Sequence, residues 1–379
     1  MLKKRFINCL FFGFLTITLF AQPTELKPKF LGNNKLVLNG VTTHLDSLDA
    51  NTRTLVLSIR NQQAELKFKE AMNLFAQDEF NKALLRFTDV ILINPEHARA
   101  YANRATLKLK ENHTKSALED YNKALNLDPS LNNAYIGRVR IYTSIAQFTE
   151  ALKDFDKVLM INPNQLEAQY LRGNTYLELE EWQKASTDFE QVLSKDSTHL
   201  FALHDHSITQ KALGNYENAL QDLKKVIAQD STFWIAYYSR AQLFIQQEAF
   251  EDAINDLKQA NHLHPNNLQI LNLLGMAHFE YKEYEHALDN YNRLIAFLGE
   301  DASAFNNRAA VKIKLKDYEG AITDCNEAIR LQESYGEAYL NRGIAHQLTA
   351  LPKKACEDWN QALTLGVKVA QEYLTQDCQ

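Results

Sequence analysis

The sequence predicts an all-α protein built from repeated pairs of antiparallel helices. Alanine recurs every 34 residues, without an insertion, along most of the 379-residue chain: Ala83, Ala117, Ala151, Ala185, Ala219, Ala253, Ala287, Ala321 and Ala355. A fixed period of this length is typical of architectures in which each unit is one helix pair. Glycine and proline are scarce, with 12 and 7 residues, which argues against a β protein with many turns.

The composition excludes two other classes of protein. The apolar share of 45% is too high for a disordered chain. The formal net charge is −6, from 41 bases and 47 acids, so a basic nucleic-acid-binding surface is not expected. We therefore expect a folded protein with no nucleic-acid partner.

Residues 1–21 have the features of a secretory signal peptide. Lys3, Lys4 and Arg5 precede an apolar run over residues 6–20, and Ala21 provides a small residue before the expected cleavage site. The run of 15 residues is short for a membrane span, although an uncleaved anchor is the alternative. We expect export to the periplasm or the cell exterior, with no stable membrane span after cleavage.

Residues 22–63 form an N-terminal segment, in which residues 22–48 differ in composition from the repeats. The stretches 36–38 and 41–43 flank Asn39 and Gly40, which is a hairpin turn signal. Residues 55–60 are expected to begin a helix that leads into the first repeat. Because a two-stranded hairpin is marginally stable alone, we expect it either to dock on the first repeat or to be loosely ordered.

Residues 64–369 contain nine predicted units of 34 residues, with Ala83 at position 20 of the first. Positions 20, 24 and 27 form one helical stripe and positions 4, 8 and 11 another. Small residues at positions 8 and 20 allow two helices to approach closely, and a bulky residue at position 24 fills the space beside them. Proline at position 32, as in Pro95 and Pro129, ends the second helix.

Charges at positions 7 and 23 vary together. Six units have Arg at position 7 and Asp at position 23, for example Arg172 and Asp188. The first unit reverses the signs with Glu70 and Arg86. In the seventh unit both charges are absent. This covariation within one chain predicts that the two positions touch and form structural ion pairs.

These columns resemble the tetratricopeptide repeat, over about four-fifths of the chain. The resemblance implies a right-handed α-solenoid of helix–turn–helix repeats whose first helices line a concave groove. It also implies a scaffold that binds a protein or peptide and has neither catalytic activity nor a cofactor. The Lys and Asn residues with which some members bind a C-terminal carboxylate are replaced by Phe68 and Met72, so we do not expect that clamp.

The resemblance also implies which side chains face the groove. In the middle repeats these positions combine aromatic rings with amide and imidazole groups, a mixture that favours partner binding. The alternative is that some of them pack against neighbouring repeats. The candidate partner-binding residues are Tyr170, Asn174, Phe201, His204, Ile208, Tyr238 and Gln242.

The sequence gives little support for metal binding or catalysis. His199, His204, Asp205 and His206 form a cluster that resembles a metal site, but neighbours at i and i+2 point to different sides of a helix. We expect a structural or groove role for them, and no bound metal. No phosphate-binding loop or nucleophile motif occurs, so the chain is predicted not to be an enzyme.

Residues 370–379 are predicted to cap the last repeat, within an amphipathic stretch over residues 367–375. Cys378 follows this stretch, and Cys356 lies on the helix that should face it. A disulfide between these two residues is one expectation, and two free thiols are the other. Cys325 is expected in the core.

The sequence is compatible with two functions. The favoured hypothesis is an exported scaffold that binds a protein or peptide in its groove. The alternative is a structural or accessory subunit of a cell-envelope or secretion assembly, which would act through its convex face or its N-terminal segment.

Overall fold

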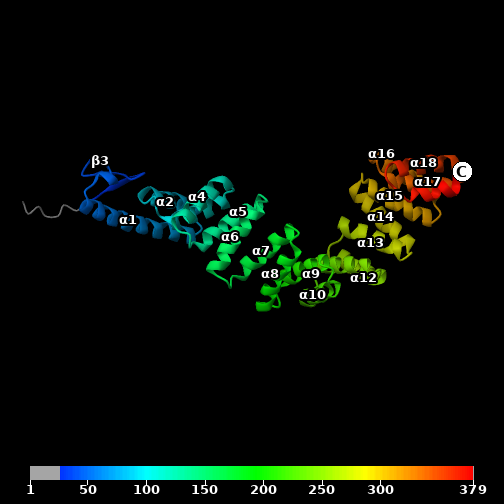
Figure 1. Ribbon diagram of the computed structural model, residues 1–379, viewed down its shortest axis with the longest axis horizontal. Coiled ribbons are helices and arrows are strands. Elements are labelled where there is room, and N and C mark those ends of the chain that lie inside the picture. The colour runs from blue at the N-terminus through cyan, green and yellow to red at the C-terminus, as the bar shows by residue number, and fades with distance from the viewer. Residues whose placement is uncertain (1–25, 379) are drawn as a thin grey trace, which may run out of the picture. The chain divides into compact units, whose positions relative to one another are not determined.

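The computed structural model describes residues 26–378 and confirms the all-α fold class, with one small sheet near the N-terminus (Figure 1). The expected signal peptide over residues 1–21 lies outside the described residues. The described chain divides into two compact units, residues 26–163 and residues 164–378. Within the described residues, no helix is both long and apolar enough to cross a membrane.

The N-terminal sheet contains three antiparallel strands in the order β1 (Lys29–Gly32), β2 (Lys35–Leu38) and β3 (Val41–His44). The predicted hairpin is β2–β3, and both turn residues have positive φ, 51° at Asn39 and 81° at Gly40. Such backbone angles match the right-handed twist of the flanking strands. Strand β1 adds a third strand to the predicted hairpin.

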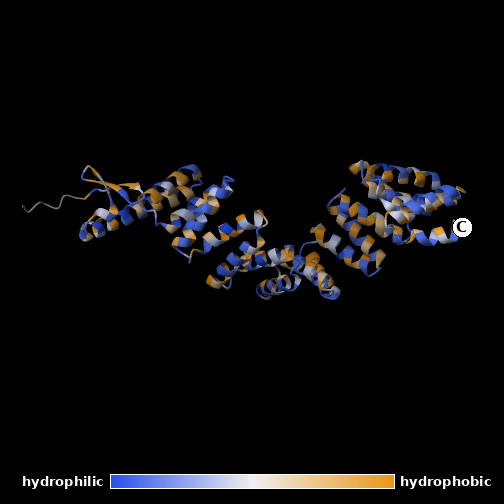
Figure 2. Cartoon of the chain, turned by 45° about the horizontal axis from the view of Figure 1, so that its top comes forward, coloured by the Kyte–Doolittle hydropathy of each residue, from blue (hydrophilic) through white to orange (hydrophobic). Residues whose placement is uncertain are grey.

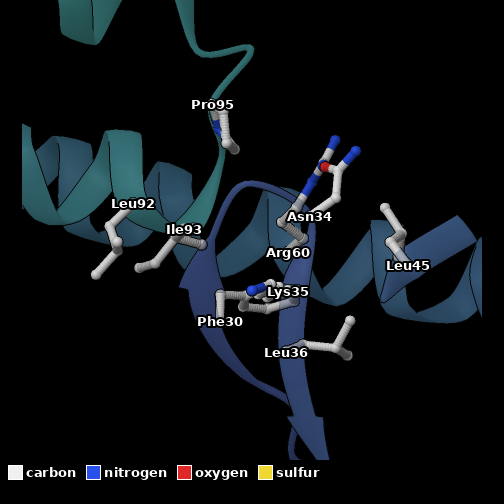
Figure 3. A pocket seen from close by; sticks show the side chains of 10 residues that line it. Phe30, Asn34, Lys35, Leu36, Leu45, Arg60, Leu92, Ile93 and Pro95 are labelled. Carbon is white, nitrogen blue, oxygen red and sulfur yellow. The ribbon is translucent and has the colours of Figure 1, made fainter. Parts of the chain in front are cut away.

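The sheet docks on the first two helices, α1 (Ala50–Ala76) and α2 (Phe80–Ile93). Leu36 of β2 is buried against Val56 of α1, and Leu45 of the short 3-10 turn Leu45–Ser47 completes this small core. Figure 3 shows Phe30 and Leu36 on the strands beside Ile93 and Arg60. The space between them is only about 10 Å³, so the sheet seals this end of the helix pair.

Helix α1 is continuous across the expected boundary between residues 63 and 64. The lead-in helix and the first helix of the first repeat are therefore one element of 27 residues. No glycine or proline interrupts residues 50–76, and Asp49 caps the N-terminus by accepting hydrogen bonds from the Asn51 and Thr52 amides.

The remaining helices follow one another as antiparallel pairs. Within each unit, each pair packs on the next, and Figure 2 shows hydrophobic and hydrophilic residues alternating along the helices. The first unit continues with α3 (Ala98–Lys110), α4 (Thr114–Leu127), α5 (Asn132–Ser144) and α6 (Phe148–Ile161). The second unit contains α7 (Leu166–Glu178), α8 (Trp182–Lys195), α9 (Leu200–Ala212), α10 (Tyr216–Gln229), α11 (Trp234–Gln246), α12 (Phe250–Leu263), α13 (Leu268–Glu280), α14 (Tyr284–Leu298), α15 (Ala302–Lys314), α16 (Tyr318–Leu331), α17 (Gly336–Leu348), α18 (Pro352–Thr364) and α19 (Ala370–Asp377).

The periodic alanines form the contact surface within each pair. All of them, from Ala83 to Ala355, are fully buried. At position 8, a Cβ on Gly173 would lie 2.7 Å from the Phe189 ring at position 24 of the same repeat. The small residue is therefore required because the large ring occupies the space beside it.

The predicted ion pairs between positions 7 and 23 are confirmed. Each arginine donates from Nε and Nη2 to the two carboxylate oxygens of its aspartate, as Arg240 does to Asp256, at 2.7 Å for both bonds. In the fifth unit, His206 takes the place of arginine and its Nδ1 lies 2.7 Å from Asp222 Oδ2. The other pairs are Arg104–Asp120, Arg138–Asp154, Arg172–Asp188, Arg308–Asp324 and Arg342–Asp358.

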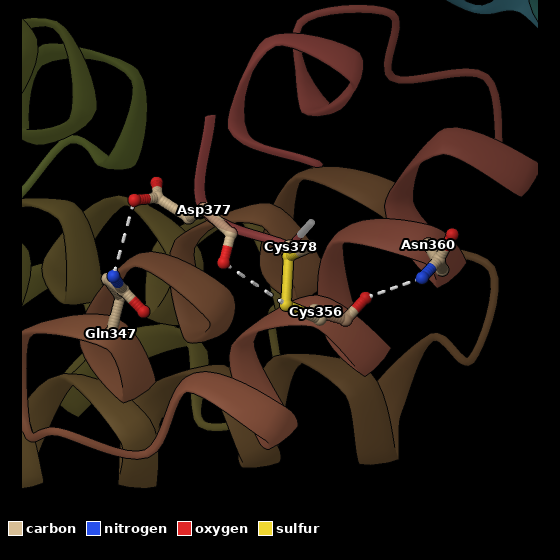
Figure 4. Close-up of a disulfide and its surroundings, with 5 residues drawn as sticks. All are labelled: Gln347, Cys356, Asn360, Asp377 and Cys378. Carbon is tan, nitrogen blue, oxygen red and sulfur yellow. Dashed lines mark hydrogen bonds between the residues drawn. A yellow bond between two sulfur atoms is a disulfide. The ribbon is translucent and has the colours of Figure 1, made fainter. Parts of the chain in front are cut away.

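Helix α19 covers the last helix pair. Its Tyr373 ring stacks on the buried Trp359 ring of α18, with 5.0 Å between the ring centroids. A disulfide joins Cys356 of α18 to Cys378, with 5.8 Å between the Cα atoms (Figure 4). Cys325 is a buried free thiol.

Candidate protein-interaction site

The seven predicted site residues lie on three neighbouring first helices of the second unit. Helix α9 contacts both α7 and α11, so side chains at equivalent repeat positions come close together. We call this surface the α7–α9–α11 face. It contains Tyr170 and Asn174 on α7, Phe201, His204 and Ile208 on α9, and Tyr238 and Gln242 on α11.

A chain of hydrogen bonds links the three helices. The Tyr170 hydroxyl donates to Asp205 Oδ2 at 2.8 Å, and Asp205 Oδ1 lies 3.0 Å from His204 Nδ1. His204 Nε2 is 3.2 Å from Ser239 Oγ on α11. Because the carboxylate can only accept, Nδ1 of His204 is the donor of its pair with Asp205.

Burial and hydrogen bonds hold the members of this chain in fixed positions. His204 is only 8% exposed, so its ring has little rotational freedom. Burial is the main cause that raises the pKa of the Tyr170 hydroxyl, and Tyr170 therefore remains a donor at neutral pH. The Tyr170 ring also lies 4.9 Å from the His199 ring, between centroids.

An exposed aromatic ring stands beside these polar groups. Phe201 is 55% exposed, and its ring meets Phe233 edge to face at 6.0 Å between centroids. Tyr238 is half-buried, with its ring 6.4 Å from the Trp234 ring. Large rings that are partly exposed but held by neighbouring rings are typical of binding hot spots.

The remaining predicted residues supply polar and apolar contact atoms. Gln242 Oε1 accepts a hydrogen bond from Lys211 Nζ at 3.2 Å, and burial lowers the pKa of Lys211. Asn174 Oδ1 is buried and has no hydrogen-bond partner in the described part of the chain. Ile208 is half-buried on α9.

Sequence reasoning missed Asp205, Ser239 and Lys211 as members of this face. Asp205 and Ser239 occupy position 6 of their repeats, and each binds the position 5 residue of the preceding repeat. The same contact recurs between Asn306 and Asn341, at 2.8 Å. A polar residue at position 5 followed 35 residues later by another is thus a signal that could have found them.

The histidine cluster is dispersed over separate contacts. His199 Nδ1 accepts from the Ala202 amide and caps α9, while His204 and His206 bind Asp205 and Asp222. Among residues 26–378, no group of His, Cys, Asp and Glu is arranged to hold a metal ion.

Ser186, His206 and Asp222 have the hydrogen-bond order of a serine hydrolase site. Ser186 Oγ lies 3.2 Å from His206 Nε2, and His206 Nδ1 lies 2.7 Å from Asp222 Oδ2. Ser186 is only 1% exposed, however, and its hydroxyl donates to Glu190 at 3.0 Å. No substrate can reach the hydroxyl without local unfolding, so this network serves packing between α8, α9 and α10.

A wide cleft lies elsewhere, in the first unit. It has a volume of about 770 Å³ and is formed by side chains of α1, α3 and α5 together with Phe80 and Tyr121. Residues of the α7–α9–α11 face do not line it. The residues predicted from the sequence therefore lie on one polar and aromatic surface and not in this cleft.

Comparisons with known proteins agree with this fold. Models described as tetratricopeptide repeat match residues 98–131, 133–165, 167–199, 205–260, 240–307 and 302–335, which together make up more than half of the chain. Tetratricopeptide repeat protein 36 of Xenopus tropicalis is 35% identical over 66 residues, which are 17% of this chain and 33% of that protein. The chain thus spans about a third of the length of this curated relative.

Two solved structures show the same fold. A tetratricopeptide repeat protein from Parabacteroides merdae is 17% identical, with a TM-score of 0.50, over 65% of this chain and 99% of that one. The C-terminal part of a repeat-containing protein from Cytophaga hutchinsonii is 18% identical, with a TM-score of 0.53, over 62% of this chain and 97% of that one. With repeat models along most of the described residues and helix pairs of the matching period, the chain belongs to the tetratricopeptide repeat family.

Proposed function

We propose that this protein is an exported, non-catalytic scaffold that binds a protein or peptide partner on the α7–α9–α11 face. The observation that carries the proposal is the exposure of Phe201, 55%, beside polar groups whose positions are fixed by hydrogen bonds between helices. Burying such a ring in a partner releases water from apolar surface and stabilises the complex.

The polar groups of the face support specificity. Hydrogen bonds already hold Tyr170, His204 and Ser239 in place in the free protein. Binding a partner therefore costs little side-chain entropy at these residues.

Export is supported by two features of the chain. The first is the signal-peptide pattern over residues 1–21, and the second is the disulfide between Cys356 and Cys378. Disulfides persist in the periplasm and outside the cell, whereas cytosolic thiols are kept reduced. Fractionation of producing cells, with the mature N-terminus read by mass spectrometry, tests this part of the proposal.

Site-specific photo-cross-linking in producing cells tests the binding face. The photoreactive residue p-benzoylphenylalanine replaces Phe201 in the full chain, and the matched control places it at the exposed Lys224 of α10. We expect a discrete cross-linked partner from position 201 and none from position 224. The face is excluded if position 201 gives no product while the variant is folded and exported.

The alternative function predicts another outcome. Strands β1 and β3 are the two edges of the sheet. Val41 on β3 is 66% exposed and provides a surface in the N-terminal segment that a partner could contact. Cross-links from position 41 or 224, in the absence of any from position 201, would favour an accessory subunit that acts through its N-terminal segment or convex face.

A further inference from the structure

The cleft of the first unit has an apolar floor. Phe75 of α1 and Phe80 of α2 meet edge to face, with 5.8 Å between ring centroids. Leu107 of α3 and Ile136 of α5 extend this surface. The volume of about 770 Å³ is large enough for several side chains of a peptide.

Two cations line the same cleft without a carboxylate partner. Lys110 and Arg140 are exposed and form no ion pair within the described residues. Lys110 Nζ lies 3.3 Å from the centroid of the Phe80 ring, so it sits over the apolar floor. The charge of Arg140 acts on the phenol of Tyr121, which also lines the cleft.

The neighbouring cations already have carboxylate partners. Arg104 and Lys108 both bind Asp120, at 2.7 Å, and Arg138 binds Asp154 at 2.6 Å. Asp78 is the single carboxylate among the residues that line the cleft. The two unpaired cations therefore leave a local positive charge on a chain whose net charge is −6.

The cleft also offers side-chain amides. Asn103 of α3 and Asn133 of α5 line it, and an amide can both donate to and accept from a peptide backbone. Cations, amides and aromatic rings from α1, α2, α3 and α5 thus line one cleft.

From this convergence we propose that the cleft is a second binding site, separate from the α7–α9–α11 face, for an extended peptide segment that combines carboxylates with a large apolar side chain. The apolar side chain lies on Phe75 and Phe80, and the carboxylates approach Lys110 and Arg140. Charge complementarity sets the preference for acidic over basic segments.

Fluorescence anisotropy with the full mature chain tests the proposal. The probes are three fluorescein-labelled decapeptides in which Phe alternates with Glu, Gln or Lys. We expect the Glu peptide to bind about tenfold more tightly than the Lys peptide at low salt, with the difference shrinking as salt rises. The double variant Lys110→Glu/Arg140→Glu is expected to reverse this order.

A matched control separates the cleft from the overall charge. The variant Lys115→Glu/Lys123→Glu makes the same charge change at exposed residues of α4 that do not line the cleft, and it should keep the preference of the wild type. Circular dichroism verifies that both variants are folded.

Three results would overturn the inference. They are equal affinity for the Glu and Lys peptides, an equal effect of the control variant, and displacement of the Glu peptide by a ten-nucleotide oligothymidine at lower concentration than by unlabelled peptide. None of these bears on the cross-links from position 201, so the two proposals fail independently.

Discussion

At the scale of single residues, the ion pairs between positions 7 and 23 hold the two helices of a repeat together. The aspartates are almost fully buried, with side-chain exposure of 3% for Asp188 and 9% for Asp256. Arg138 additionally donates from Nη1 to Asn122 of the preceding repeat at 2.7 Å, and Arg308 and Arg342 do the same to Asn292 and Asn326. The arginine thus joins neighbouring repeats as well as the two helices of its own.

Arg240 and Asp256 allow a clean double-mutant cycle. Replacing Asp256 by Asn or Arg240 by Leu alone leaves a buried charge unpaired, and each change should lower the free energy of unfolding by about 3 kcal/mol. The double variant reproduces the Leu274 and Asn290 combination of the seventh repeat and should cost clearly less than the sum. Urea denaturation measures all four proteins, and additive losses would contradict a direct pair.

His278 makes stability depend on pH. Burial lowers the pKa of its imidazole, which is 2% exposed and lies 2.6 Å from Glu283 Oε2 through Nδ1. At pH values between the lowered pKa of His278 in the folded protein and its unfolded value of about 6.5, the unfolded chain binds more protons than the folded protein. Stability is therefore fully present above that range and falls as the pH drops through it.

Urea denaturation from pH 7.5 to pH 5.5 tests this dependence. Wild type should lose stability on acidification, and His278→Gln should lose less over the same range, whatever its stability at pH 7.5. Exposed His262→Gln is the control. Parallel curves for wild type and His278→Gln would exclude this histidine as a source of the dependence.

At the scale of elements, the turn inside each helix pair uses one left-handed residue. The residue at position 15 has positive φ in every pair: Asp78, Asn112, Ala146, Glu180, Gly214, Glu248, Lys282, Lys316 and Ala350. Only Gly214 is a glycine, so the other side chains occupy a backbone region that costs them free energy.

Replacing the left-handed alanines by glycine should stabilise the protein. Ala146 and Ala350 have φ of 55° and 60° and are exposed, so Ala146→Gly and Ala350→Gly lose no packing. Each should raise the free energy of unfolding by about 0.5–1 kcal/mol, since glycine adopts this conformation without strain. Thermal and urea unfolding measure the gain.

The control for this prediction is Ala310→Gly, in the middle of α15. That change should destabilise by about 0.5–1 kcal/mol, because glycine is unfavourable inside a helix. A loss of stability in Ala146→Gly as well would contradict the account of the turn.

At the scale of the whole molecule, each helix pair buries its apolar stripe against its sequence neighbours within the same unit. Within the second unit, α8 packs on α7 and α9, as successive helices do throughout that unit. A solenoid of this kind has stability that is approximately the sum of repeat and nearest-neighbour terms. A defect in one repeat should therefore remain local.

Phe189→Ala tests this locality. The ring is fully buried against Gly173, and its removal should cost about 3–5 kcal/mol. Hydrogen exchange followed by mass spectrometry should rise in α7–α9 and stay unchanged in α13–α18. The exposed Thr187→Ala on the same helix is the control, and a rise over the entire unit would contradict nearest-neighbour behaviour.

The candidate site was only partly accessible to sequence reasoning. Equivalent repeat positions placed Tyr170, His204 and Tyr238 on adjacent helices, because the period brings them there. The partners Asp205 and Ser239 depend on contacts between residues 35 apart, which a single repeat does not reveal.

The sequence by itself determined the helix pairs, because a 34-residue period of small and large residues is buried only by its neighbours in the chain. The tertiary structure alone decided that β1 joins the sheet, that α1 is one helix, and that Lys110 and Arg140 line the same cleft. Core packing here joins helices that are neighbours in the sequence, so the sequence pattern predicts it. The candidate binding surfaces are formed by side chains of several helices. Their charge and shape depend on how these helices pack, which the repeat pattern does not specify.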